Sequence, residues 1–104
     1  MARVGGRYWL AYSGNWWNQD AYGVGLARCE SPRGPCEKPF DHAVLVTRPG
    51  AEGPGGLEFF RDAAGTLRVV YHAWLDTPGY PGSRALWIDG VDVSGPAPVL
   101  RPGG

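Results

Sequence analysis

Two kinds of segment are missing from this sequence of 104 residues: runs of basic residues and long apolar stretches. Ten Lys and Arg residues balance ten Asp and Glu residues, so electrostatic binding to nucleic-acid phosphates has little support. No apolar stretch approaches the roughly 20 residues that a membrane-spanning helix needs. Residues 1–6 contain no apolar signal core. We therefore expect no nucleic-acid partner and no membrane partner, and we identify no signal peptide in this chain.

Common catalytic motifs are also missing. The sequence has no complete G-x-G-x-x-G, no phosphate-binding Walker loop and no nucleophile elbow. Asn15 and Asn18 are not glycosylation acceptors, because neither has a hydroxyl residue two places on. No window of 11 residues shows the apolar stripe of an amphipathic helix. Nucleotide binding and serine-hydrolase chemistry therefore have no support.

Glycine and proline are abundant, at 17 and 10 residues, and are accompanied by 5 Trp and 5 Tyr. Such a composition disfavours long helices and favours short strands joined by turns. A hydrophobic fraction of 43% argues against disorder. We predict an all-β chain.

Apolar or alternating segments between the Pro/Gly-rich loops indicate where the strands lie. Strands are predicted at residues 7–13, 22–28, 43–47, 57–61, 67–73 and 84–89, with one more short strand within 91–101. Pro/Gly loops are predicted at 29–39, 48–56 and 76–83, and a turn at 62–65. One face of strand 22–28 carries only Gly23, Gly25 and Ala27, which usually lets another backbone approach closely.

One strand pattern occurs twice, at residues 6–15 and 65–74, with an offset of 59 residues. Each copy has a glycine turn followed by a buried strand that ends in Tyr12 or Tyr71. A repeated unit of a few short strands is typical of a β-propeller blade. Chance similarity between two strands of a sandwich is the alternative. We predict a partial β-propeller of about two blades, each an antiparallel four-stranded sheet, at about 4–47 and 57–100.

Cys29 and Cys36 enclose a short segment rich in turn residues. Such a loop can return Cys36 to Cys29, so a disulfide is predicted, which favours an oxidising compartment. A zinc site formed by the two cysteines with His42 and His72 is the rival interpretation. Its spacing fits none of the usual zinc-binding arrangements.

Six strings in order resemble glycoside hydrolase family 43, the five-bladed β-propeller arabinanases, arabinofuranosidases and xylosidases. The strings are GRYWLAYSGN (6–15), YGVGLA (22–27), SPRGP (31–35), GPGG (53–56), FRDAAG (60–65) and YHAW (71–74). They resemble the family's G-x-Y-Y-L-F-Y-S strand, Y-x-x-G-x-A strand, S-P-x-G-P loop, G-P-G loop, D-x-x-G turn and Y-H-A strand. The resemblance spans residues 4–100.

This resemblance implies the last two of five blades, that is, a C-terminal portion of such an enzyme. In the family, an E-G-P motif with the catalytic general acid shortly precedes the first of these strands, and Met1 falls inside that interval. The inverting mechanism uses an Asp base, an orienting Asp and the Glu acid, and none of the three maps to this sequence. We therefore expect no catalytic residue here and a piece that is inactive alone.

The implied partners are the missing N-terminal blades of the same protein and a pentose-containing oligo- or polysaccharide. The full-length protein would cleave O-glycosidic bonds in plant polysaccharides that contain arabinose or xylose, and it would be secreted. Two other functions remain open. One is a non-catalytic, lectin-like carbohydrate-binding module, and the other is a repeat protein that closes a ring by self-association.

Three acidic residues deserve comparison with the family's acids. Glu52 begins a Glu-Gly-Pro string that imitates the acid motif, but it precedes the wrong strand, so we interpret it as an exposed loop residue. Glu58 falls on a strand and would face the central channel or the solvent. Asp62 belongs to a turn, where Asp bonds its own backbone.

Aromatic residues near loop ends are candidates for sugar binding, because sugars present apolar C–H faces to flat rings. The candidate substrate-binding residues are Trp16, Trp17, Tyr22 and Trp74. Packing between blades is the alternative for each. Asn15 and Gln19 could bond sugar hydroxyls.

His72 is the candidate metal residue. The resemblance places the equivalent His near the propeller axis, beside a structural calcium ion or its water shell. Calcium prefers oxygen ligands, so His72 would be an atypical ligand or would contact the bound water. A core histidine bonded to backbone is the alternative.

Overall fold

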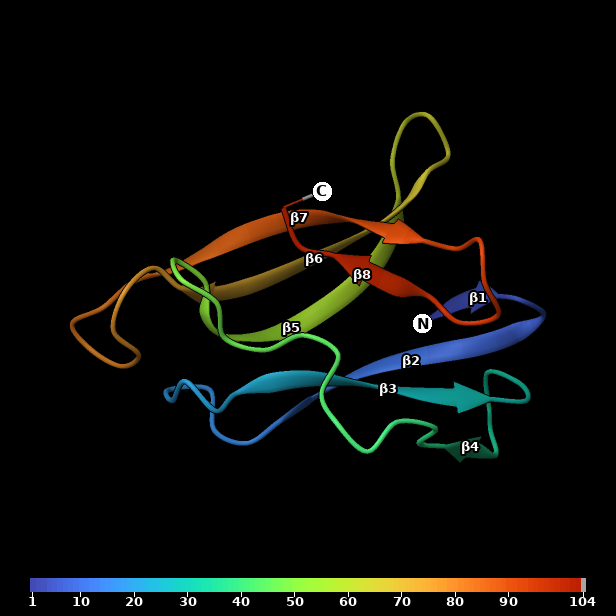
Figure 1. Ribbon diagram of the computed structural model, residues 1–104, viewed down its shortest axis with the longest axis horizontal. Coiled ribbons are helices and arrows are strands. Elements are labelled where there is room, and N and C mark those ends of the chain that lie inside the picture. Colours follow the sequence, from blue (N-terminus) through green and yellow to red (C-terminus); the bar gives the residue numbers. More distant parts are fainter. Residues whose placement is uncertain (104) are drawn as a thin grey trace.

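The computed structural model describes residues 1–103, which form two antiparallel sheets of four strands each. The strands are β1 (Ala2–Val4), β2 (Arg7–Gly14), β3 (Gly23–Cys29), β4 (Cys36–Glu37), β5 (Glu52–Arg61), β6 (Leu67–Trp74), β7 (Arg84–Asp92) and β8 (Val99–Arg101). Each sheet is a meander in chain order, β1 to β4 and β5 to β8, and Figure 1 shows the two sheets as stacked layers. Within residues 1–103 no helix could span a membrane. The all-β prediction is confirmed.

The linker between the sheets differs from its prediction. Residues 43–47 are not a strand but form a single bridge, in which Leu45 pairs with Val24. The side chain of Leu45 is nevertheless buried, which explains why the segment is apolar. The predicted loop at 48–56 is wrong in its second half, because β5 begins at Glu52. Register shifts on either side of Gly55 fit the Gly and Pro residues into the strand.

Apolar side chains of both sheets and the linker form the core between the layers. One cluster contains Val24, Leu45, Leu57, Val69 and Tyr71. A second cluster contains Val4, Trp9, Leu26 and Leu67. Both clusters combine residues of the first and second sheets, so the sheets form one folded unit.

The repeated strand pattern has a consistent sidedness. On β6, Leu67, Val69 and Tyr71 are buried toward the first sheet. At the offset of 59 their counterparts are Tyr8, Leu10 and Tyr12 of β2. Because neighbouring Trp9 belongs to the core and side chains alternate along a strand, these counterparts lie on the outer face of the first sheet. In the repeated pattern, the outer face of the first sheet is therefore the counterpart of the face that the second sheet buries against the first sheet.

Two small residues of β3 are covered in different ways. A Cβ at Gly23 would lie 3.1 Å from the carbonyl oxygen of Leu45, so the linker backbone does approach closely there, as predicted. At Gly25 the prediction of a neighbouring backbone is wrong. The ring of Tyr12, directly opposite on β2, lies over Gly25 and would be 2.4 Å from a Cβ.

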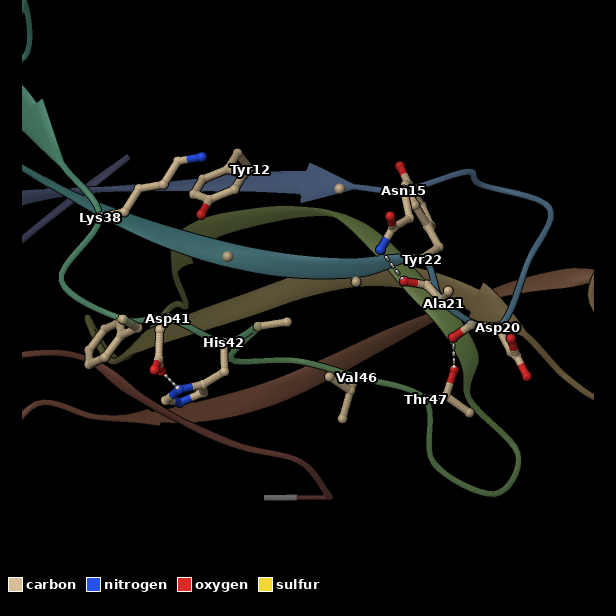
Figure 2. Close-up of a pocket in the computed structure, with 15 residues that line it drawn as sticks. Tyr12, Asn15, Asp20, Ala21, Tyr22, Lys38, Asp41, His42, Val46 and Thr47 are labelled. Atoms are coloured by element: carbon tan, nitrogen blue, oxygen red, sulfur yellow. Dashed lines mark hydrogen bonds and ion pairs between the residues drawn. The ribbon is translucent and has the colours of Figure 1, made fainter.

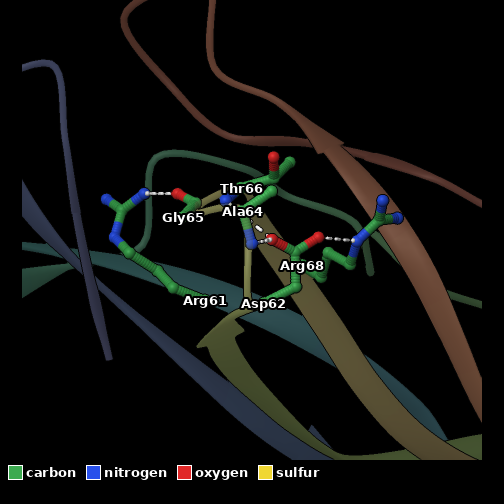
Figure 3. A network of polar contacts seen from close by, with 6 residues as sticks. All are labelled: Arg61, Asp62, Ala64, Gly65, Thr66 and Arg68. Atoms are coloured by element: carbon green, nitrogen blue, oxygen red, sulfur yellow. Dashed lines mark hydrogen bonds and ion pairs between the residues drawn. The ribbon is translucent and has the colours of Figure 1, made fainter.

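The turn between β5 and β6 is held by Asp62, as predicted from its Asp-Ala-Ala-Gly sequence. One Asp62 oxygen accepts hydrogen bonds from the backbone N–H groups of Ala64 and Thr66, each at 2.9 Å. The other accepts from Arg68 Nε at 2.6 Å, and Arg61 bonds the Gly65 carbonyl (Figure 3). These contacts lower the pKa of Asp62, with the Arg68 hydrogen bond as the largest cause. Asp62 is therefore committed to the turn.

Cys29 and Cys36 face each other across the β3–β4 pair and are joined by a disulfide. Both sulfurs are thus consumed, and neither is a thiolate ligand for zinc. Within residues 1–103 no three His, Cys, Asp or Glu side chains are grouped to hold a metal ion. The short strand β4, which the sequence did not indicate, is the arm that carries Cys36 back to β3.

Candidate functional site

Loops from both sheets meet at one end of the molecule. The β2–β3 loop, the β6–β7 loop and the turn before β5 all lie at the left in Figure 1. Direct contacts join them: Thr47 Oγ1 donates to the carbonyl of Asp20 and accepts from the backbone N–H of Gly53 at 2.8 Å. We call this end, with the residues of β6 and β7 that adjoin it, the loop end. It contains all the aromatic candidates.

Trp17 and Trp74 are stacked at the loop end, with ring centroids 5.8 Å apart and planes at 24°. The indole N–H of Trp74 donates to the carbonyl of Trp17 at 2.9 Å, which fixes the loop on the strand. Trp74 is only 2% exposed, so its prediction as a sugar-contacting residue is corrected: it supports Trp17 from below. Trp17 and Trp16 are 46% and 69% exposed and present their rings to solvent.

Tyr22 connects the two sheets at this end. Its ring lies against Gly55 of β5, where a Cβ would come within 1.9 Å of it. The guanidinium of Arg84 lies over the same ring, 5.6 Å from the centroid. Tyr22 is half-buried, so part of the ring remains open to a ligand.

Arg84, at the start of β7, is the polar centre of the loop end. Its Nε donates to His72 Nδ1 at 2.8 Å, and its two terminal nitrogens donate to backbone carbonyls. Those carbonyls belong to Trp17, Gly53 and His72. The guanidinium also lies 5.1 Å from a Trp74 ring centroid. One side chain thus ties together β5, β6, β7 and the β2–β3 loop.

Sequence reasoning missed Arg84. Its only signal is a basic residue that follows a Pro/Gly loop and opens a strand, and many surface arginines share that pattern. Its importance depends on carbonyl groups up to 67 positions away.

His72 is half-buried on the outer face of the second sheet. Burial lowers its pKa, and the positive charge of Arg84 lowers it further. The resemblance implies a calcium ion here, but the residues do not fit direct ligation. The Nδ1 lone pair is taken by Arg84, and within residues 1–103 no acidic cluster supplies oxygen ligands.

A hollow of ≈ 600 Å³ lies beside β2, β3 and the linker rather than over His72. Figure 2 shows Tyr12, Lys38 and His42 among its lining residues. Some of its polar groups are hydrogen-bonded within the protein. Asn15 Nδ2 donates to the Ala21 carbonyl at 2.9 Å, so Asn15 stabilises its own loop. The lysine ammonium lies 4.8 Å from the Tyr12 ring centroid. The hollow adjoins the loop end, because Asp20 and Tyr22 of the β2–β3 loop and Thr47 line it. We place the candidate site at the exposed aromatic rings of the loop end.

Carboxyl groups with shifted pKa values are all shifted downward. Those of Glu37, Asp41, Asp62 and Asp92 are lowered chiefly by side-chain hydrogen bonds, from Arg28, His42, Arg68 and Ser94 respectively. A general acid needs the opposite shift, since it must keep its proton near neutral pH.

The two remaining acid candidates also lack the expected setting. Glu52 is half-buried at the start of β5, so its assignment to an exposed loop is wrong. Glu58 is exposed on β5 opposite Val70, on the outer face of the second sheet.

Two solved structures share this fold closely. A thermostable family-43 glycoside hydrolase superimposes with a TM-score of 0.84 and 30% sequence identity over 96% of this chain. The chain is a structural relative of family-43 glycoside hydrolases. An endo-1,4-beta-xylanase from Bacteroides thetaiotaomicron VPI-5482 follows, with a TM-score of 0.81 and 26% identity over 96% of the chain. No family profile and no curated protein sequence matches this chain.

This chain spans 33% of the length of the family-43 glycoside hydrolase and 35% of the length of the xylanase. The resemblance to family 43 drawn from the six strings is confirmed, and so is the fold class, a partial β-propeller with two four-stranded sheets.

Proposed function

We propose that this chain forms part of the carbohydrate-binding cleft of a glycoside hydrolase of the family-43 type. The exposed Trp17 ring, held on buried Trp74 at the loop end, carries this proposal. A flat ring that is fixed in place binds the C–H face of a sugar with little loss of side-chain entropy. Trp16 and the open part of Tyr22 extend the aromatic surface beside it.

The proposed substrates are plant polysaccharides that contain arabinose or xylose. The xylanase described above supports xylose-containing chains as substrates, since it shares this fold at 26% identity. Extracellular polymers of this kind also suit a secreted protein, for which the Cys29–Cys36 disulfide is appropriate.

Catalytic carboxylates are proposed to lie outside this chain. An inverting glycosidase needs a protonated acid and an ionised base about 6.5–9.5 Å apart. The downward pKa shifts found here suit ion pairs and turns rather than the acid. We expect no hydrolysis of aryl arabinofuranosides or xylosides by the chain alone, measured by release of the aryl group from pH 4 to 9 (a range of about 5 units around neutrality). Hydrolysis that co-purifies with the folded chain would contradict the proposal that the catalytic carboxylates lie outside it.

Further blades of the same protein are the proposed partners for the two outer sheet faces. Tyr8, Leu10 and Tyr12 on the first sheet repeat the pattern of the β6 residues that the second sheet buries. On the second sheet, Leu86 and Ile88 are 75% and 59% exposed beside half-buried Val70. An apolar face of this kind usually marks an interaction surface.

The blade proposal predicts that the isolated chain self-associates through these faces. The double variant L86K/I88K is expected to sediment as a monomer at concentrations where the unmodified chain forms larger species. V46K is the control, because Val46 is comparably exposed at 58% but lies on the linker. A monomeric unmodified chain would contradict the proposal.

Sugar binding is tested by titrating the chain with arabino- and xylo-oligosaccharides while tryptophan fluorescence is recorded. W17A is expected to weaken binding by about 5- to 150-fold, which corresponds to the loss of about 1–3 kcal/mol measured when an aromatic partner of a stacked nucleobase is removed. Y8A is the matched control, since Tyr8 lies on the outer face of the first sheet. Equal affinities of W17A and the unmodified chain would refute the assigned role of Trp17.

A lectin-like module is the second candidate, and the same exposed indoles of Trp16 and Trp17 favour it. The two functions predict different results when the missing blades are added to the chain. If the remainder of a family-43 propeller, supplied in trans, restores hydrolysis, the enzyme proposal holds. Sugar binding by the chain with no gain of hydrolysis favours the lectin-like module.

A further inference from the structure

The side chain of Arg84 is held rigidly against His72. Its Nε donates to His72 Nδ1 at 2.8 Å, while one terminal nitrogen donates to the His72 carbonyl at 2.7 Å. Further bonds to the carbonyls of Gly53 and Trp17, at 3.0 and 3.1 Å, fix the plane of the guanidinium. Because Arg keeps its charge in proteins, each of these nitrogens acts only as a donor.

This contact determines which nitrogen of His72 carries the proton. A neutral imidazole has one N–H and one lone pair, and Nδ1 must use its lone pair to accept from Arg84. The single proton therefore belongs on Nε2. The pKa of His72 is lowered by burial and by Arg84, which keeps the ring neutral.

We propose that Arg84 is a positioning residue that holds His72 as a hydrogen-bond donor through Nε2, in place of the calcium role implied by the family resemblance. A metal ion needs a ring lone pair, and neither nitrogen offers one in this tautomer. Water bound to a cation directs its hydrogens outward, so it is a poor acceptor for Nε2–H. The guanidinium itself supplies the positive charge at this position.

The Nε2 atom lies beside Gly56, where a Cβ would come within 2.3 Å of it. Gly56 has φ +66 and is exposed, and the absence of a side chain lets the backbone of β5 pass close to this nitrogen. Within residues 1–103 no acceptor is bonded to Nε2. The group that fits there is an acceptor oxygen, such as a sugar hydroxyl or a carboxylate of another blade. The identification of a sugar as the acceptor rests on the proposed function, whereas the assignment of the His72 proton to Nε2 does not.

Nitrogen-15 NMR of the imidazole ring tests the tautomer directly in the ligand-free chain. We expect a protonated Nε2 and an unprotonated Nδ1, and we expect added calcium chloride to leave both resonances unchanged. A proton on Nδ1, or a calcium-dependent shift of either ring nitrogen, would overturn the proposal. Sugar titration is recorded separately, so a failure to bind sugar counts against the proposed function alone.

A variant adds a second measurement. R84M keeps a long apolar side chain but removes every donor, and it is expected to change the ratio of the two His72 tautomers by about 10- to 100-fold toward Nδ1–H. R101M, which removes the arginine that pairs with Asp92, is the control and should leave the ring nitrogens unchanged. An unchanged ratio in folded R84M would refute the role of Arg84, and if R84M does not fold, the measurement on the unmodified chain decides.

Discussion

The Tyr71 hydroxyl donates a hydrogen bond of 2.5 Å to Asp89 Oδ2 inside the interface between the two sheets. Asp89 is 2% exposed and Tyr71 is 1% exposed. Arg48 of the linker donates to the same hydroxyl at 2.8 Å, and the backbone N–H of Gly103 donates to Asp89 Oδ1 at 3.0 Å. Burial raises the pKa of Tyr71, and the Asp89 hydrogen bond raises it further. This network ties the linker and the C-terminal segment to the second sheet.

Replacement of Tyr71 by Phe is expected to lower the free energy of unfolding by about 1.5–3 kcal/mol, because a buried carboxylate loses its closest donor. Urea denaturation followed by tryptophan fluorescence measures the loss. Y80F is the control and should leave the midpoint unchanged, since Tyr80 is 89% exposed. If Y71F unfolds at the same urea concentration as the unmodified chain, the hydrogen bond contributes nothing to stability.

Stability is expected to fall as the pH drops below about 6.5, the ordinary pKa of His. The folded chain holds the pKa of His72 below that value, so the unfolded chain takes up the proton first on acidification. The His72 contribution is therefore complete above pH 6.5, declines as the pH falls toward the folded pKa and is constant below it. Carboxylates whose pKa is lowered in the folded chain, such as Asp62, change the stability only at a more acidic pH.

Thermal unfolding between pH 7.5 and 5.5, a span of about 2 units around that pKa, measures this dependence. H72N is expected to flatten it, because Asn can accept from Arg84 but does not titrate. H42N, a change at an exposed histidine, is expected to keep the dependence of the unmodified chain. A parallel decline in H72N and the unmodified chain would assign the effect to other groups.

Gly53 is expected to tolerate no side chain. It has φ +54, and a Cβ there would lie 2.3 Å from the backbone carbonyl oxygen of Gln19. G53A combines left-handed strain with overlap, and we expect it to cost about 2–5 kcal/mol. G65A has the strain alone, as its φ is +81 with nothing within 4 Å, so about 1–2 kcal/mol is expected.

Chemical denaturation of the two variants, with G14A as the control that has neither strain nor overlap, separates the two effects. Equal losses in G53A and G65A would show that the approach of the Gln19 carbonyl has no energetic consequence.

Reduction of the Cys29–Cys36 disulfide is expected to lower stability by about 2–3 kcal/mol, since the bond closes a short loop in the unfolded chain. Urea midpoints with and without reductant measure the loss. The double variant C29A/C36A should unfold near the reduced midpoint and should not respond to reductant. A reductant effect that persists in this variant would point to a cause other than the disulfide.

Local chemistry alone determined much of this protein. Abundant Gly and Pro and the unbroken aromatic and apolar runs at residues 7–13 and 67–73 predicted short strands, and Asp62 predicted its turn, because these features depend on neighbours a few positions away. The strand β5 was placed too late, since its Gly-Pro-Gly-Gly string is typical of a loop and becomes a strand only by pairing with β6.

Tertiary structure alone decided the roles of the loop-end residues. The sequence did not distinguish Trp17 from Trp74, since both are aromatic residues near loop ends. In the structure they contact each other across 57 positions, and Trp74 is buried while Trp17 stays exposed. Arg84 has no local signature, because its partners are carbonyl groups of three separate segments. Contacts between residues far apart in the chain decide which of several similar side chains is buried. The residues next to each side chain in the sequence do not reveal those contacts.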